Sequence, residues 1–466
     1  MKFILSVFFL SLGFSTVFGQ NSVQSNKGTT NQQPTDSIFI RKIYDEALTA
    51  SPAYENLRSL CKDVGARITG SAEAEMAIYW GKQLLDSYGF DTVYLQEIKV
   101  PHWERGTAES AWIIDKNGKA KKLNVIALGG SVGTNGLMQG ELVAVNGLED
   151  LVKLGEAKIK GKIVFFNRPF DQKMINTFKA YGACVDQRWG GAKEASKYGA
   201  KGVIIRSLAQ ADDDHPHTGV MDYEMEKPIP AAAMSTNDAN TVTEWLKNGK
   251  VTLRLEMDCR FYEDMISYNV IGETRGKDKK IITFGGHLDS WDVGEGAHDD
   301  GAGIIHSIEA LRILKALNYQ PTHTLRCVLF MNEENGNFGG KTYAQKANEN
   351  KEEHICALES DRGGFLPLGF DVVGTPEQLK FVQGFKPMLA DYRLYNFEMG
   401  YGGVDIGPLR DFYPGMLQLG LNPVSQRYFD FHHAETDVFE NVNKRELELG
   451  GAAMATMVYL MDKYVE

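Results

Sequence analysis

Cysteine and clustered basic residues are both scarce in this chain. Its 466 residues include five cysteines, none in CxxC spacing: Cys61, Cys184, Cys259, Cys327 and Cys356. We expect no disulfide framework, and we interpret Cys327 and Cys356 as small apolar residues of buried strands. The net charge is −11 without a block of Lys and Arg. This balance argues against nucleic acid as a partner, because phosphates require clustered basic residues.

Long apolar segments are scarce as well, and the one that stands out is at the N-terminus. It follows Lys2, ends near Val17-Phe18-Gly19, and is shorter than the ~20 residues of a membrane span. We interpret residues 1–19 as a signal peptide, with an uncleaved membrane anchor as the alternative. Residues 20–37 are rich in Asn, Gln, Ser and Thr and are predicted to form a disordered leader. We therefore expect a secreted or periplasmic protein, without membrane attachment after signal cleavage.

The most informative segment runs from residue 287 to residue 303 and combines histidine, carboxylates and glycine. The β-branched and aromatic residues 281–284 before it predict a buried strand. His287 and Asp289 would then follow the carboxyl end of that strand, where open α/β sheets bind ligands. Apolar residues recur at helical spacing over 304–317. The local architecture predicted is strand, acidic loop and helix.

Further carboxylates and histidines follow other predicted strands or lie near the C-terminus. The apolar runs 325–331 and 355–358 predict two of these strands. The residues with potential metal-ligating side chains are Glu333, Glu334, Asp361, His432 and His433. Imidazole nitrogen and carboxylate oxygen without thiolate suit zinc at a catalytic site, because structural zinc sites favour cysteine.

These motifs together resemble the zinc-dependent M28 peptidases, and within them the carboxypeptidase Q branch. The similarity extends from about residue 50 to the end. It also covers the segments 100–106, 216–219 and 359–361. The resemblance implies two zinc ions per chain. The implied ligands are His287 and Asp361 for one ion, Glu334 and His433 for the other, and Asp299 bridging both.

The choice between the two adjacent histidines follows from the same resemblance. In the family, the ligand lies four residues before an Asp-Thr pair. Asp437 therefore selects His433 over His432, although Val438 stands where the family has threonine.

The implied ligand set is balanced in charge. Two divalent cations carry four positive charges; the carboxylates Asp299, Glu334 and Asp361 remove three, and a bridging hydroxide removes the fourth. Glu333 is the expected general base, which would take the proton of water and deliver it to the leaving amine. The carboxylate of Asp289 is expected to hold the imidazole of the neighbouring histidine ligand.

Other histidines receive structural interpretations. His298 lies beside a ligand without matching a ligand position, and His306 falls inside the predicted helix. The stretch 212–217 is interpreted as a charged surface loop, with the alternative that His217 approaches the substrate cleft. Side-chain preference and the oxyanion donor stay open: the loop 402–408, Tyr401 and Tyr428 are the candidates.

The predicted fold is α/β, with a mixed central sheet flanked by helices and a β-rich insert that resembles a protease-associated domain. Strands predicted at 140–145, 161–166 and 199–205, each introduced by a glycine turn, and a helix at 192–198 form the insert. The boundaries are 38–130 for the first part of the peptidase domain, 131–258 for the insert, and 259–466 for the second part with the metal site.

The expected function is hydrolysis of dipeptides or short peptides with free termini. Within enzymes, the alternative is a broad M28 aminopeptidase, which requires only a free N-terminus. Transferrin receptors combine similar domains as non-catalytic binding proteins, and glutaminyl cyclases use the fold with a single zinc. Both alternatives predict an altered ligand set, whereas suitable residues occupy every implied position here. Related proteins form homodimers, so a homodimer is a further expectation.

Overall fold

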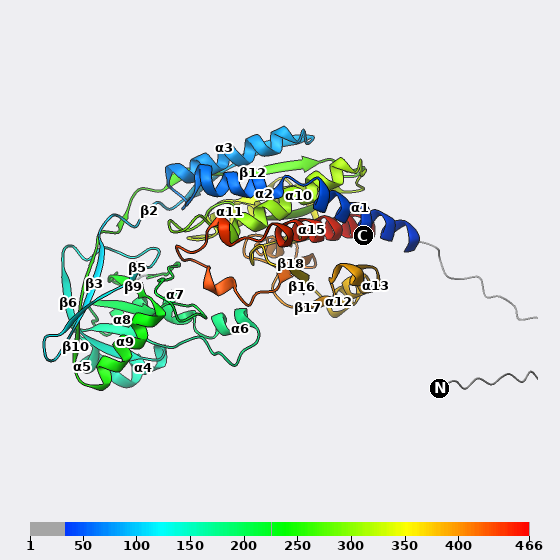
Figure 1. Cartoon of the computed structure of the whole chain (residues 1–466). Coiled ribbons are helices and arrows are strands. Elements are labelled where there is room, and N and C mark those ends of the chain that lie inside the picture. Colours follow the sequence, from blue (N-terminus) through cyan, green and yellow to red (C-terminus); the bar gives the residue numbers. More distant parts are fainter. Residues whose placement is uncertain (1–32, 225, 466) are drawn as a thin grey trace, which may run out of the picture.

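The computed structural model describes residues 33–224 and 226–465 as two units, each built on an eight-stranded mixed sheet (Figure 1). The first unit contains residues 33–100 and 265–465. The inserted unit, residues 101–264, lies between them in the chain. The signal peptide predicted at 1–19 falls outside the described residues. Among the helices of the described ranges, none is both long and apolar enough to cross a membrane.

The first sheet has four central parallel strands with an antiparallel neighbour on each side. In spatial order its strands are β1 (Thr92–Val100), β12 (Met265–Thr274), β14 (Thr324–Phe330), β13 (Lys280–His287), β15 (Glu353–Glu359), β18 (Leu417–Pro423), β16 (Pro367–Val373) and β17 (Asn396–Met399). The strands β14, β13, β15 and β18 are the parallel neighbours. Their carboxyl ends therefore lie along one edge of the sheet.

Both faces of this sheet are buried, which explains the continuous apolar runs in the sequence. In β14, Cys327 and Leu329 join the core on one face, and Val328 and Phe330 join the core on the other. This follows from the two-residue period of a strand. Helices α1, α3, α10 and α15 contribute to the first core, and α11 and α14 to the second.

The first unit contains several α-helices, and one of them matches the helical spacing predicted over 304–317. They are α1 (Gln33–Thr49), α2 (Ala53–Ser59), α3 (Ala72–Ser87), α10 (Ala302–Ala316), α11 (Phe338–Glu349), α12 (Pro376–Gln383), α13 (Lys386–Leu389), α14 (Leu409–Phe412) and α15 (Lys444–Tyr464). Helix α15 packs against both α10 and α1, so the first and last described helices lie side by side (Figure 1).

The leader predicted at 20–37 extends too far. Helix α1 begins at Gln33, and Asp36 is buried, with 1% exposure. Its carboxylate accepts hydrogen bonds from the hydroxyls of Tyr459 (2.6 Å) and Tyr464 (2.5 Å) in α15. These contacts join residues more than 400 positions apart in the sequence. The composition of the segment alone therefore could not indicate them.

The second sheet belongs to the inserted unit. In spatial order its strands are β4 (Ala120–Leu123), β3 (Glu109–Asp115), β10 (Val251–Met257), β6 (Met138–Val145), β7 (Ile163–Phe166), β8 (Gly202–Arg206), β9 (Ala231–Met234) and β5 (Val125–Ala127). Its helices are α4 (Leu148–Leu154), α5 (Glu156–Ile159), α6 (Thr177–Gly182), α7 (Asp186–Trp189), α8 (Gly191–Lys197) and α9 (Thr236–Lys247). The predicted strands and helix thus appear as β6, β7, β8 and α8, in a unit that mixes strands with helices.

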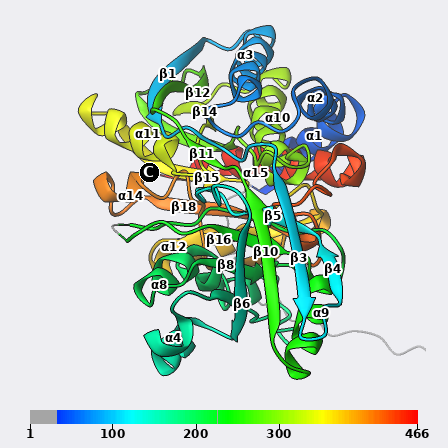
Figure 2. The same ribbon diagram turned by 90° about the vertical axis from the view of Figure 1, so that its left-hand side faces the viewer.

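The start predicted for the insert, residue 131, is too late. Strands β3, β4 and β5 precede it and already belong to the second sheet. The two chain segments that connect the units run antiparallel, and β2 (Trp103–Glu104) pairs with β11 (Arg260–Phe261) between them. Figure 2 shows β3 and β10 side by side beyond this connection. The boundary was missed because pairing between distant segments defines it, and no local turn signal marks it.

Candidate metal centre

The candidate ligands meet at the carboxyl ends of the parallel strands of the first sheet. His287 ends β13, Glu334 follows β14, Asp361 follows β15, and His433 lies in the loop after β18. Asp299 comes from the irregular turn Ala297–Gly301, before α10. Strand ends that share one edge of a parallel sheet bring residues from distant parts of the sequence together.

Asp299 lies between the two histidines. Its Oδ1 is 3.2 Å from Nε2 of His287, and its Oδ2 is 3.3 Å from Nε2 of His433. Nε2 of His287 is also 3.5 Å from Oδ1 of Asp361, and Nε2 of His433 is 3.1 Å from Oε2 of Glu334. Nε2 of His432 is farther from Asp299, at 3.8 Å. One carboxylate thus faces two clusters of potential ligands.

The carboxylates of this cluster have hydrogen-bonding capacity that the protein leaves unused. Asp299 Oδ2, Glu334 Oε1 and Asp361 Oδ1 are buried without a hydrogen-bond partner among the described residues. Buried polar atoms normally have partners. Their convergence with two imidazole nitrogens fits a site for divalent cations, whose ligands need unshared electron pairs.

The electrostatics of the cluster agree with that fit. Burial, followed by the charge of Asp299, raises the pKa of Glu334 to about 7. Burial lowers the pKa of His433, but Glu334 and Asp299 outweigh it and raise that pKa to about 9. Three carboxylates thus face two imidazoles in this buried cluster, and bound cations would compensate for the excess of negative charge.

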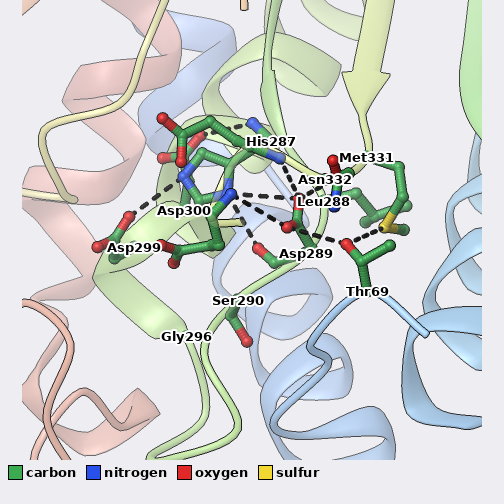
Figure 3. A network of polar contacts seen from close by, with 12 residues as sticks. Thr69, His287, Leu288, Asp289, Ser290, Gly296, Asp299, Asp300, Met331 and Asn332 are labelled. Carbon is green, nitrogen blue, oxygen red and sulfur yellow. Dashed lines mark hydrogen bonds and ion pairs between the residues drawn. The ribbon is translucent and has the colours of Figure 1, made fainter. Parts of the chain in front are cut away.

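The imidazole of His287 is oriented by a backbone carbonyl, and the expected role of the Asp289 carboxylate is corrected here. Nδ1 of His287 lies 3.0 Å from the carbonyl oxygen of Asp289 but 3.9 Å from its Oδ1. The carboxylate instead accepts backbone N–H groups from Asn332 (2.7 Å), Glu333 (3.1 Å) and Glu334 (3.3 Å). Figure 3 shows its contacts with Thr69 and Asn332. Asp289 therefore shapes the acidic loop that carries Glu333.

The imidazole of His433 is oriented across the boundary between the two units. Its Nδ1 lies 3.3 Å from the carbonyl oxygen of Thr218, and the N–H of Thr218 donates to the His433 carbonyl (2.9 Å). Nδ1 of His217 lies 2.6 Å from the carbonyl oxygen of His432. His217 is 1% exposed, so the interpretation of 212–217 as a surface loop does not hold for its last residue.

Two further residues position the site through contacts that the sequence did not indicate. The Asp437 carboxylate accepts the N–H groups of His298 (2.7 Å) and Asp299 (3.0 Å), which fixes the turn that carries Asp299. Arg67 is fully buried and donates to the carbonyl groups of Leu288, Gly65, Glu295 and Gly296. Arg67 lies far from this loop in sequence and belongs to no motif, so only the structure reveals its contact.

The loop 402–408 is fixed beside the metal centre by Glu359. The Glu359 carboxylate accepts the N–H groups of Val404 and Ile406, both at 2.8 Å. At Gly403, which has φ of 147°, a Cβ would lie 2.1 Å from the Glu359 Cδ, so only glycine fits. Tyr428 is 3% exposed and packs on His432. Tyr401 is 52% exposed. The hydroxyls of Tyr428 and Tyr401 are both still candidates for the oxyanion donor.

The two histidines interpreted as structural make contacts of that kind. His298 stacks on Phe365, with ring centroids 4.3 Å apart. His306 is fully buried in α10, and its Nδ1 lies 2.9 Å from Oγ of Ser360. All five cysteines are buried as free thiols.

Comparison with known proteins identifies the family. The model of peptidase family M28 matches residues 269–458. The chain is 33% identical to carboxypeptidase Q of Bos taurus, over 91% of this chain and 88% of that protein. It is 26% identical to probable leucine aminopeptidase 2 of Aspergillus fumigatus, over 66% of this chain and 55% of that protein.

A solved structure agrees with this result along nearly the whole chain. The peptidase M28 precursor from Shewanella amazonensis matches with a TM-score of 0.87 at 32% identity, over 92% of this chain and 97% of that one. The mixed sheet and the buried cluster of histidines and carboxylates agree with a metallopeptidase. The chain belongs to peptidase family M28. The fold class and the family predicted from the sequence are thereby confirmed.

Proposed function

We propose that this chain is an exported exopeptidase that binds two zinc ions and hydrolyses dipeptides or short peptides with free termini. The observation that carries the proposal is the buried convergence of two imidazoles and three carboxylates that keep unpartnered oxygens. Export rests on the signal peptide predicted at residues 1–19. The inserted unit is proposed to be a protease-associated domain, and the molecule a homodimer.

Zinc suits these donors because imidazole nitrogen and carboxylate oxygen are its usual ligands at catalytic sites with open coordination. His287 and Asp361 would hold one ion, Glu334 and His433 the other, and Asp299 both. When bound, the metal supplies Lewis acidity and lowers the pKa of water from 15.7 to about 7.

Two interactions prepare the histidines for this role. Nδ1 of His287 donates to the carbonyl of Asp289 and Nδ1 of His433 donates to the carbonyl of Thr218. Deprotonated at Nε2, each ring would offer its lone pair on the side that faces Asp299. Partners of this kind fix the tautomer and the orientation of metal-binding imidazoles.

Glu333 is the proposed general base. It is the neighbour of Glu334, and its backbone N–H is held by Asp289 in the loop after β14. Its carboxylate would accept a proton from water and return it to the leaving amine, which contributes roughly 10²–10⁴-fold to the rate of such reactions. The hydroxyl of Tyr428 or of Tyr401 would donate to the oxygen that gains negative charge.

The proposal is tested with one dipeptide and its N-acetylated, C-amidated and chain-extended forms at equal zinc. A site that pairs both charged termini leaves a buried group unpaired when one terminus is blocked. We expect kcat/KM to fall about tenfold to over a hundredfold for each blocked form. If the amidated dipeptide reacts as fast as the free one, the dipeptidase assignment is wrong.

An aminopeptidase with wider specificity is the second candidate. The similarity to a protein named probable leucine aminopeptidase 2 favours it. In the same assay, an aminopeptidase would lose activity on N-acetylation alone and would accept the amidated and extended peptides.

A further inference from the structure

A cavity of about 450 Å³ lies in the first unit and shares no lining residue with the metal centre. Helix α1, the first turns of helix α15 and the 3₁₀ turn Ala390–Tyr392 form most of its wall. Helices α1 and α15 pack side by side (Figure 1), so the wall joins the two ends of the described chain. The volume of the cavity is typical of sites for small molecules.

The less exposed part of the wall is apolar and aromatic. It consists of Tyr44, Leu48, Leu366, Tyr392 and Leu449. Tyr44 is buried, and its ring stacks on that of Tyr392 with the centroids 3.9 Å apart. Leu48 follows Tyr44 by one turn on the same face of α1. These side chains offer a surface on which an apolar group would be removed from water.

The exposed part of the wall is charged, and arginine predominates in it. It consists of Arg41, Asp391, Arg393 and Arg445. Arg41 is paired with Asp45 at 2.8 Å. Within the described residues, the side chains of Asp391, Arg393 and Arg445 form no ion pair and no hydrogen bond. Two guanidinium groups and one carboxylate therefore leave one positive charge in excess in the wall.

Both of these arginines stand at fixed backbone positions. Arg445 lies in the first turn of α15, where its N–H donates to the side chain of Asn443 at 3.0 Å. Arg393 ends the 3₁₀ turn in the left-handed conformation, with φ of 64°, and its N–H donates to the carbonyl of Ala390 at 3.0 Å. Residues with a side chain rarely adopt this conformation, and glycine would fit it more easily. An arginine at such a position points to a use for its side chain.

The two parts of the wall together define the chemistry of a ligand. Arginine argues against a metal cation, because a guanidinium has no acceptor to offer. It binds a carboxylate instead, through two parallel charge-assisted hydrogen bonds. One excess positive charge matches a ligand with one negative charge, and the apolar surface matches a nonpolar body on the same molecule.

We propose that this cavity binds a small organic monocarboxylate with an apolar body. Its carboxylate pairs with Arg393 and Arg445, and its body covers the leucines and Tyr392. The site is separate from the metal centre, so the inference goes beyond the proposed function and does not depend on it. A bound ligand would contact α1, α15 and the 3₁₀ turn at once and would hold these segments together.

The first test measures binding of 3-phenylpropionate, 3-phenylpropionamide and inorganic phosphate to the zinc-loaded protein by calorimetry. The acid should bind at least about tenfold more tightly than the amide, which lacks the charge. It should also bind more tightly than phosphate, which lacks the apolar body. The acid should raise Tm as well, because a ligand that binds only the native state stabilises it.

The second test locates the site with two variants. Arg393→Gly removes the side chain and suits the left-handed backbone, so Tm without ligand should not fall. Arg393→Gly and Arg445→Gln should each raise the Kd of the acid about three- to tenfold, and the double variant should lose the binding that is outside the metal centre. The rate of dipeptide hydrolysis should stay unchanged. Arg254→Gln is the matched control, because this exposed side chain contacts Gln139 in the inserted unit.

Three results would overturn the proposal. The first is a wild type that does not bind the acid. The second is a double variant that binds the acid as tightly as the wild type does, which would place all binding at the metal centre. The third is equal affinity for the acid and the amide, which would show that the guanidinium groups take no part. None of these measurements requires peptidase activity, so a failure of the proposed function is detected separately.

Discussion

The two halves of the proposed metal centre are built in different ways. The His287 half is made within the first unit, where β13 ends in His287, the Asp289 carbonyl orients its ring, and Asp300 accepts its backbone N–H at 3.1 Å. The His433 half depends on the inserted unit, since Thr218 orients its ring. The position of His287 is fixed by the register of one sheet. The orientation of His433 is fixed by the contact between the two units. The site therefore depends on both units although the ligands come from one.

The largest effect is expected from a change that spares the ligands of both halves. Glu333→Gln keeps the shape of the side chain but removes the proton acceptor. We expect kcat to fall roughly 10²–10⁴-fold with the full metal content retained. Enzyme kinetics and metal analysis of the purified variant check this result. A decrease below about tenfold would remove Glu333 from the general-base role.

The next test removes a proposed ligand from one half and measures the zinc content of the variant. His433→Ala should lower the zinc content from two ions to one per chain, because the remaining ligands of that half are Glu334 and the shared Asp299. His432→Ala is the matched control and should keep both ions, since its ring is the more distant one from Asp299. Metal analysis after dialysis without chelator gives the stoichiometry. The opposite pattern would assign the ligand to His432.

The third test changes Asp289, which holds the loop after β14. This loop carries both the proposed general base, Glu333, and the proposed ligand Glu334. Asp289→Asn leaves one carbonyl oxygen to accept the three N–H groups that the carboxylate now holds. Losses of about 10–100-fold in metal affinity or activity are typical for such supporting residues. Thr69→Val removes a single donor to Asp289 and should have a smaller effect on kcat/KM. Equal effects of the two variants would contradict this ranking.

The smallest effect on the site is expected from the contact between the two units, in which His217 donates to the carbonyl of His432. His217→Leu removes the donor to the carbonyl of His432 and leaves that carbonyl unsatisfied, at a cost of about 1–3 kcal/mol. We expect a lower Tm and easier removal of zinc by a chelator. His215→Leu is the control, because its pair with Glu435 is exposed and contributes little. A change in Tm without any change in zinc release would show that docking does not support the metal centre.

The sequence predicted the parts of the site that local pattern determines. A buried strand followed by a carboxylate or histidine is visible in a short window, and the ends of β13, β14 and β15 were found in this way. The residues that orient the site were missed or misplaced. The carboxylate of Asp289 serves a loop 43 residues away, and the Thr218 carbonyl meets the ring of His433 across 215 positions. Contacts over such separations leave no periodicity in the sequence, because packing of the finished fold creates them.

The antiparallel pairing of the two connecting segments has one more consequence. Val100 and Met265 are direct partners in the first sheet, Trp103 pairs with Phe261, and Glu109 pairs with Met257 in the second sheet. The two connecting segments thus run together like one β-hairpin in which a folded unit replaces the turn. A short turn grafted after Val100 would close the first sheet without the inserted unit, as a minimal scaffold. Such a shortened protein would keep the geometry of the His287 half. It would lose the Thr218 carbonyl that orients the ring of His433.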